Sequence, residues 1–203
     1  YMRSFSAEIK GIRGDLVILD ATCFYPTGGG QRNDTGLLVI GDLRVRVTDV
    51  FKIGDVVIHR VDGRLPEDLV GSKAEGVIDW ERRYRIMRHH TATHALLGAL
   101  RKIYGDHVWQ AGAEKTEEKG RLDVTHHLSI GREDVKKIEA AVNKIIDERR
   151  PVRVKYMDRY DAENKYGYSI YQGGVPQEKI LRIVEIDDWD AEACFGTHLA
   201  NTG

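Results

Sequence analysis

Two histidines one helical turn apart are the first residues of this sequence that could carry chemistry. His90 and His94 lie in RIMRHHTATHALLGALRKIYG, on the same apolar stripe as Met87 and Leu97. Residues at positions i and i+4 project from one face of a helix, and two imidazoles placed in this way can bind one metal ion. The alternative is a pair of packed histidines whose nitrogens are satisfied by hydrogen bonds.

A second pair of potential ligands with the same spacing stands near the end of the sequence. Cys194 and His198 occur in ACFGTHL, where Gly196 permits a tight backbone path. Three histidines and one thiolate suit a single Zn²⁺ ion, whereas Cys194 alone could be a small buried apolar residue. Four protein ligands are typical of a closed structural site, because a catalytic zinc usually keeps one position for water.

The stretch CFYPTGGGQRNDTG contains three consecutive glycines, Gly28, Gly29 and Gly30, after a β-rich run. Such a segment lets the backbone approach another group closely and exposes its N–H donors. Its spacing differs from that of a P-loop and from that of a Rossmann turn. Thr27 and Gln31 flank the glycines and could face a ligand. The alternative is a plain glycine-rich hairpin.

Four arginines crowd the start of the histidine helix: Arg82, Arg83, Arg85 and Arg88. They could contact the phosphates of an RNA, or they could form a solvated helical face. The formal net charge of −1 gives no global field that indicates a nucleic-acid partner. A local groove can still be basic on a neutral protein.

Further histidines follow the helix. His107, His126 and His127 could shuttle protons, but a structural role satisfied by hydrogen bonds is the expected one for each. Asp123 stands beside the last two in RLDVTHH and could orient a reacting group. These residues are weaker signals than the two four-residue pairs.

The composition is that of a globular chain. Its 203 residues, 41% hydrophobic and 31% charged, indicate one large or two small domains with a real core. No apolar run approaches the ~18 residues that a membrane span requires. Cys23 and Cys194 are too few for a disulfide framework and indicate a reducing compartment. The abrupt ends suggest a segment of a longer chain.

The region 5–62 reads as short strands. DLVILD, GLLVI, LRVRVTDV and DVVIHRV are rich in Val, Ile and Leu, and turn glycines separate them. Strands of this length and spacing predict a small antiparallel barrel or sandwich. The segment 64–73, with Pro66 and Gly71, is the expected boundary before the histidine helix.

The remainder alternates between helix and strand. Helices are expected over 80–104 and over 133–149, the second with Val135, Ile138, Val142 and Ile145 on one face. Strands are expected over 120–128, 151–157 and 179–187. This mixture predicts an α+β fold in which helices pack on one face of a sheet.

Several motifs together resemble a known family. HHTATH, HVWQAG, RLDVTHH and ACFGTHLANTG, in this order, resemble the editing domain of alanyl-tRNA synthetases and the related free-standing AlaX proteins. FYPTGGGQRNDTG is similar to the glycine-rich motif of the β-barrel that precedes the editing core in that family. The stretch DHVWQAGAEK…RLDVTHH looks more like an archaeal synthetase than an AlaX protein. The resemblance covers nearly the whole chain and implies a barrel over 1–75 and an editing core over 76–203.

The resemblance also implies roles for individual residues. It assigns one Zn²⁺ ion to His90, His94, Cys194 and His198. It assigns catalytic roles to Gln110, at the editing pocket, and to Thr27, whose hydroxyl recognises serine. It assigns substrate binding to Thr27, Gly28, Gly29, Gly30, Gln31 and Asp123. The sequence departs from the family pattern Cys-Gly-Gly-Thr-His at Phe195, which puts the local backbone path and the pocket shape in question.

The implied activity is hydrolysis of mischarged seryl-tRNA(Ala), and secondarily of glycyl-tRNA(Ala), by part of a longer cytoplasmic synthetase. The implied partner is the acceptor end of tRNA(Ala), with no membrane involved. One alternative is a free-standing AlaX protein. Another is a non-catalytic tRNA-binding module with a structural zinc ion. The related editing domain of threonyl-tRNA synthetases is a third, but the family pattern there lacks the glycine-rich motif.

Overall fold

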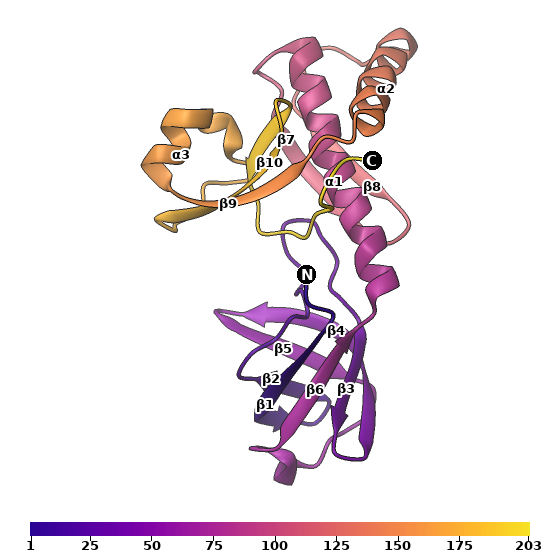
Figure 1. The fold of residues 1–203 in the computed structure, drawn as a ribbon, viewed down its shortest axis with the longest axis vertical. Helices are drawn as coiled ribbons and strands as arrows, with labels where there is room; N and C mark the ends of the chain where they lie inside the picture. Colours follow the sequence, from indigo (N-terminus) through magenta and orange to yellow (C-terminus); the bar gives the residue numbers. More distant parts are fainter. The chain divides into compact units, whose positions relative to one another are not determined.

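The computed structural model describes all residues from Tyr1 to Gly203. The chain forms two compact units, Tyr1–Arg85 and Ile86–Gly203. Figure 1 shows the strands of the first unit and the mixed helices and strands of the second. The predicted α+β class is confirmed, since antiparallel sheets and three α-helices make up the chain.

Six antiparallel strands close the first unit into a barrel, in the order β1-β2-β5-β4-β3-β6. Their bounds are β1 Ser4–Arg13, β2 Leu16–Leu19, β3 Gly36–Ile40, β4 Leu43–Ile53, β5 Val56–Val61 and β6 Lys73–Ile78, with the 3₁₀ turn η1 at Glu67–Leu69. In β4 the side chains of Val45, Val47 and Val50 are buried in the barrel. Arg44 and Arg46 alternate with them and face outward, as one solvated sheet face requires.

The barrel is closed by a strand that the sequence pattern did not indicate. β6 pairs with both β1 and β3. It begins at Lys73, the last residue of the segment 64–73, and continues past the expected domain boundary at residue 75. Gly76 is required there, because a Cβ atom on it would lie 2.2 Å from the ring of Phe5. A strand that contains Gly, Lys and Glu has low intrinsic β-propensity, so its pairing partners decide its conformation.

The second unit contains two small antiparallel sheets, ordered β11-β10-β9 and β7-β8, instead of the single sheet that we expected. Its elements are β7 Gln110–Lys115, β8 Gly120–Val124, α2 Arg132–Asp147, β9 Val152–Asp158, α3 Arg159–Tyr166, η2 Tyr168–Ile170, β10 Ile180–Ile186 and β11 Asp190–Ala193. Helix α1, Trp80–Tyr104, begins in the first unit and has the predicted bounds. The sequence pattern did not predict β7, α3 or β11.

Helices α1 and α2 and the β10–β11 turn form the core that supports the histidines. Leu97 and Leu100 of α1 pack with Ile138 of α2, and Trp189 lies against the same cluster. Gly98 lets Trp189 approach α1, because a Cβ atom on it would lie 2.6 Å from the indole ring. Trp189 Nε1 also donates a hydrogen bond of 2.8 Å to the carbonyl oxygen of Ala95.

The predicted apolar face of α2 is correct only in part. Ile138 and Ile145 are buried and Val142 packs against the core, but Val135 is half exposed. None of the helices combines the length and the hydropathy required to cross a membrane.

Candidate metal centre and glycine-rich loop

Helix α1 places His90 and His94 one turn apart, and both side chains are buried. Cys194 and His198 lie in the segment that follows β11. The backbone of this segment is fixed to its neighbours, since Cys194 N donates to Arg182 O at 3.0 Å and Leu199 N donates to Thr91 Oγ1 at 3.1 Å. The structure therefore brings the two predicted pairs together. Ligand atoms from all four residues lie within 4.8 Å of one another.

The spacing of these atoms fits a tetrahedral metal ion. Cys194 Sγ lies 3.5 Å from His90 Nε2 and 3.4 Å from His198 Nε2. Bonds of about 2.3 Å to sulfur and about 2.0–2.1 Å to nitrogen around one zinc ion would separate a sulfur and a nitrogen ligand by about 3.6 Å. The two sulfur–nitrogen distances thus agree with two edges of such a tetrahedron.

Two carboxyl groups lie beside the nitrogens of His94, and a hydroxyl lies beside one nitrogen of His198. Asp190 Oδ2 lies 3.5 Å from His94 Nδ1, and Glu192 Oε2 lies 3.3 Å from His94 Nε2. His198 Nδ1 lies 3.3 Å from Thr91 Oγ1, within hydrogen-bond distance. Metal-binding histidines usually have such a partner on their second nitrogen, because it fixes the tautomer and the ring orientation.

Burial keeps the three imidazoles neutral, which is the form that binds a metal ion. It lowers the pKa of His198 to about 3, and the charge of Arg182 acts in the same direction. It lowers the pKa values of His90 and His94 well below the ordinary value, with a further contribution from neighbouring imidazoles. Burial raises the pKa of the Cys194 thiol to about 11. A bound ion would therefore displace the thiol proton.

Four residues around the centre were missed by the sequence reasoning: Thr91, Lys115, Asp190 and Glu192. Burial raises the pKa values of Asp190 and Glu192, and their proximity raises that of Glu192 further. Lys115 is buried too. Desolvation lowers its pKa, whereas the nearby Cys194 and Glu192 act to raise it. A strand places residues i, i+2 and i+4 on one face. The pattern D-x-E-x-C at 190–194 therefore carried a signal that could have found the two acids.

Glu192 also has an unused acceptor. Its Oε1 is buried without a hydrogen-bond partner in the protein, as is His94 Nδ1. An unsatisfied buried polar atom costs about 1–3 kcal/mol. Asp190 Oδ2 is buried without a hydrogen-bond partner as well, and three such atoms beside one cluster of ligands indicate that the cluster accommodates an ion or a polar ligand.

The glycine-rich loop lies in the first unit, between β2 and β3. The loop closes through a bridge between Gly28 and Gln31, and Gly29 and Gly30 have φ values of 57° and 76°. Glycine adopts these values without the strain that a Cβ atom imposes. Gln31 is fully buried, whereas Thr27 is exposed. The hydroxyl of Thr27 accepts from Asn33 N at 3.2 Å and donates to Asn33 Oδ1 at 3.3 Å.

A buried ion pair fixes the end of this loop to the first turn of α1. Arg83 Nε donates to Asp34 Oδ1 at 2.7 Å, and Arg83 Nη2 donates to Asp34 Oδ2. Asp34 Oδ2 also accepts from Tyr25 N at 2.5 Å. The guanidinium group of Arg83 is buried and paired. For Arg83, the predicted phosphate contact and the alternative of a solvated helical face are therefore both wrong.

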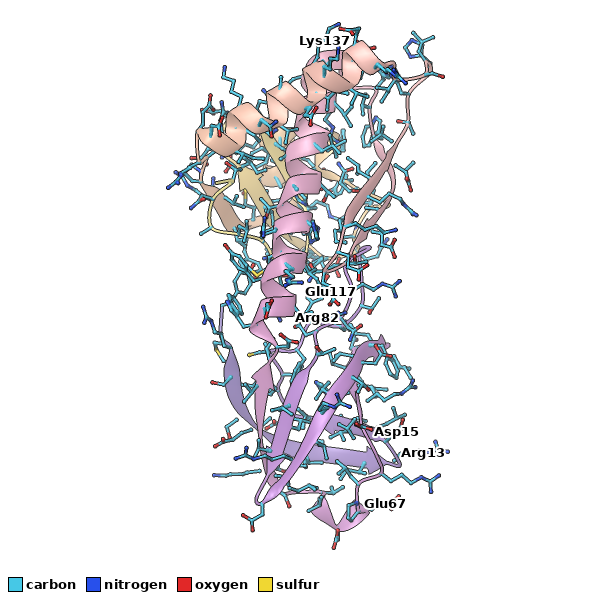
Figure 2. All side chains as sticks on the ribbon, turned by 90° about the vertical axis from the view of Figure 1, so that its right-hand side faces the viewer. Arg13, Asp15, Glu67, Arg82, Glu117 and Lys137 are labelled. Atoms are coloured by element: carbon cyan, nitrogen blue, oxygen red, sulfur yellow. The ribbon has the colours of Figure 1, made fainter.

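The other arginines of the group differ from Arg83. Arg82, labelled in Figure 2, donates to the carbonyl oxygen of Asn33 at 3.1 Å. Arg85 forms an exposed pair with Glu81 at 2.6 Å. Arg88 is exposed. Contact of these side chains with RNA stays a prediction.

Gln110 and Asp123 lie on the β7–β8 hairpin, whose connection carries Glu117 (Figure 2). Gln110 N donates to Gln172 Oε1 at 3.3 Å. Asp123 is exposed and forms a pair of 3.2 Å with Arg121. Its carboxylate also covers Gly112, where a Cβ atom would lie 2.8 Å from Oδ2. The substrate-binding roles of these residues and of the loop remain predictions.

Two family models match the chain. Residues 1–82 match the model of class II (A) tRNA synthetases. Residues 181–203, which include Cys194 and His198, match the model described as the threonyl and alanyl tRNA synthetase second additional domain.

Curated relatives match the chain from end to end. It is 59% identical to an alanine–tRNA ligase of Ignicoccus hospitalis and 58% identical to one of Hyperthermus butylicus, with 100% of the chain aligned in both. An alanine–tRNA ligase of Aeropyrum pernix is 52% identical over the same extent. Over its whole length the chain is similar to one segment of alanine–tRNA ligases. It spans about 22% of the length of these relatives.

The resemblance drawn from the motifs is thus confirmed at the level of the family. Phe195, where the sequence departs from the family motif, lies on the surface. The side chain of Phe195 is 54% exposed, and its backbone has no positive φ. Gly196 N still lies 3.3 Å from Cys194 Sγ. Phe195 therefore leaves the four candidate ligands together.

Proposed function

We propose that this chain is an editing hydrolase that removes serine, and secondarily glycine, from mischarged tRNA(Ala). The observation that carries the proposal is the convergence of His90, His94, Cys194 and His198. It occurs in a chain whose relatives are alanine–tRNA ligases and whose final residues match the second additional domain. We also propose the division into a glycine-motif domain, 1–75, and an editing domain, 76–203.

The need for such an activity follows from the limits of binding. A site shaped for alanine cannot exclude the smaller glycine by size, and it rejects an added hydroxyl only modestly. Differences of one methylene or one hydroxyl give about 10–200-fold discrimination. A second site that hydrogen-bonds the serine hydroxyl works in the opposite sense, because alanine leaves that site with an unpaired buried group. Such a group costs about 1–3 kcal/mol.

The ligand set supports one Zn²⁺ ion, since imidazole nitrogen and thiolate sulfur are its usual donors. When bound, zinc supplies Lewis-acid polarisation or orientation of an ester oxygen. His90, His94, Cys194 and His198 would hold it. A complete set of four protein ligands favours orientation of the substrate over production of hydroxide.

The chain's own residues supply the proton transfers of the proposed reaction. In hydrolysis, a water oxygen bonds to the ester carbonyl carbon, and the bond from that carbon to the ribose oxygen breaks. The water loses a proton, and the ribose oxygen gains one. We assign both transfers to the carboxyl group of Glu192. Its Oε1 lacks a hydrogen-bond partner, and burial raises its pKa, which favours the protonated form.

Substrate recognition is the role that we propose for the remaining predicted residues. We propose that Thr27 binds the serine hydroxyl through Oγ1 and that the amides around Gly28, Gly29, Gly30 and Gln31 face the substrate. Gln110 and Asp123 are proposed for the pocket of the editing domain. The partners are the acceptor end of tRNA(Ala) and the remainder of a longer synthetase. The cytoplasm, where tRNA is charged, is the proposed compartment.

Deacylation of seryl-, glycyl- and alanyl-tRNA(Ala) by the chain, with and without a zinc chelator, tests this proposal. We expect rapid, chelator-sensitive loss of serine, slower loss of glycine, and intact alanyl-tRNA. The second candidate is a tRNA-binding module with a structural zinc ion, which the four-ligand set favours. It predicts tRNA binding without hydrolysis of any substrate, and unfolding when the metal is removed.

A further inference from the structure

Three histidines outside the candidate metal centre come together at one end of the β7–β8 hairpin. His107 lies between α1 and β7, and His126 and His127 follow β8. One ligand nitrogen from each lies within 4.8 Å of those of the other two. We call this group the histidine triad. It shares no residue with the candidate metal centre.

Thr125 holds together the two segments that carry the histidine triad. Its Oγ1 donates to the carbonyl oxygen of His107 at 3.1 Å and accepts from Trp109 N at 3.0 Å. Its backbone N–H donates to Trp109 O at 2.9 Å. These bonds extend the hairpin ladder beyond the pair Gln110 and Val124. The backbone beneath the imidazoles is therefore positioned without any ligand, as a built site requires.

The closest nitrogens of the histidine triad have a spacing that an ion can use. His107 Nε2 and His126 Nδ1 are 2.9 Å apart. Two nitrogens bound at about 2.0–2.1 Å to one tetrahedral ion are about 3.3 Å apart. Only one of these two nitrogens carries the hydrogen that joins them, and the other already has a lone pair. When the donor ring takes the tautomer with its hydrogen on the other ring nitrogen, both facing nitrogens have a lone pair and both rings stay neutral. A small rotation of either ring replaces the hydrogen bond with two ligand bonds.

The surroundings of the histidine triad also suit a cation. His126 packs against the ring of Tyr104, with centroids 4.4 Å apart. The carboxylate of Asp134 interacts electrostatically with His126. A neutral imidazole is the form that binds metal. Asp134, in the first turn of α2, supplies a negative charge nearby.

We propose that His107, His126 and His127 form a second metal site, open to solvent, for a divalent transition-metal ion such as Zn²⁺, Ni²⁺ or Co²⁺. These ions accept imidazole ligands readily. Three protein ligands leave at least one position for water or another ligand, unlike the four-ligand centre. His107 and His127 are exposed, so the ion can exchange directly with solvent. It would join the segment before β7 to the segment before α2.

Zinc titration of the metal-free 203-residue chain, with bound metal measured after equilibrium dialysis, tests the second site. We expect two ions per chain for the wild type and one for His107→Ala at the same free zinc concentration. Loss of a direct ligand should weaken binding by at least the ~10–100-fold typical of outer-shell changes. His89→Gln is the matched control, because His89 belongs to neither cluster and its Nδ1 contacts Thr116 O at 2.7 Å. It should retain two ions.

Two further measurements separate this proposal from the function proposed above. Cys194→Ala should still bind one ion through the histidine triad, whatever its hydrolytic activity. In the wild type, zinc should shift the imidazole ¹⁵N resonances of His107 and His126. This measurement does not require any variant to fold. One bound ion per wild-type chain, with these resonances unchanged at saturating zinc, would overturn the second site.

Discussion

The Sγ atom of Cys194 lies 3.5 Å from Nε2 of His90, although the two residues are 104 positions apart in the sequence. Strand β11 produces this approach, since it leads directly into Cys194 beside α1. The same strand places Asp190 and Glu192 on the face of Cys194. This short strand therefore supplies the two carboxyl groups and leads directly into a candidate ligand, Cys194.

Glu192→Gln should slow deacylation of seryl-tRNA(Ala) by about 10²-fold or more, because loss of a general acid or base typically has an effect of 10²–10⁴. The amide keeps the size of the side chain, so the variant should retain its metal. Rates and bound zinc measured on the same sample check this. Glu185→Gln is the control, since Glu185 lies on β10 and pairs with Lys155. An unchanged rate in Glu192→Gln would show that another group carries out the proton transfers.

Thr27→Val should weaken hydrolysis of the seryl substrate selectively, because valine keeps the shape of threonine but removes the hydroxyl. A hydrogen bond worth about 0.5–1.5 kcal/mol corresponds to a loss of about 2–10-fold. Thr27→Ser should preserve activity, which controls for the bonds between Thr27 and Asn33. The check is the ratio of kcat/KM for seryl- and glycyl-tRNA(Ala). Equal losses for both substrates would contradict the role of Thr27.

Arg83→Met should reduce the free energy of unfolding of the barrel unit by about 3–5 kcal/mol, because it leaves the buried carboxylate of Asp34 without its partner. Denaturant unfolding, followed through tryptophan fluorescence, to which Trp80 contributes from the barrel unit, measures the change. The double variant Arg83→Met/Asp34→Asn should recover part of the loss, since the amide carries no charge. A loss below about 1 kcal/mol, the range of exposed pairs, would contradict the buried character of this pair.

Tyr171 should make the stability of the second unit depend on alkaline pH. Burial and the hydrogen bond of 2.5 Å to Glu163 Oε1 raise the pKa of Tyr171 to about 12. A folded pKa above the unfolded value of about 10 stabilises the fold fully below pH ~10 and less as pH rises to ~12. The difference in unfolding free energy between the wild type and Tyr171→Phe should shrink over that range. A difference independent of pH would show that the phenol is not perturbed.

The sequence predicted the elements whose patterns are local. The α1 bounds and the strands of the first unit that carry Val, Ile and Leu followed from periodicity and turn glycines. β6 and β11 were missed because Gly76, Asp190 and Glu192 are poor strand formers, and their neighbours in the fold determine their conformation. The division of the second unit into two sheets likewise depends on pairing that no local pattern encodes.

The sequence predicted the candidate ligands of the site but not the residues that surround them. The spacing of His90 and His94, repeated at Cys194 and His198, predicted the four residues that the structure brings together. Arg83 could not be distinguished from the exposed Arg88, because its burial depends on Asp34, 49 residues earlier. The histidine triad depends on the pairing of β7 with β8, which brings residue 107 beside residues 126 and 127.

The most direct test of the central claim compares deacylation of seryl-tRNA(Ala) by the wild type, Cys194→Ala and Cys23→Ala, with metal content measured on each. Cys23 is the matched control, because it is the other free cysteine and lies in the barrel unit. We predict chelator-sensitive hydrolysis by the wild type and Cys23→Ala, and loss of both the thiolate-bound zinc and the hydrolysis in Cys194→Ala. Full activity of Cys194→Ala without metal at His90 and His94 would contradict the proposed editing mechanism.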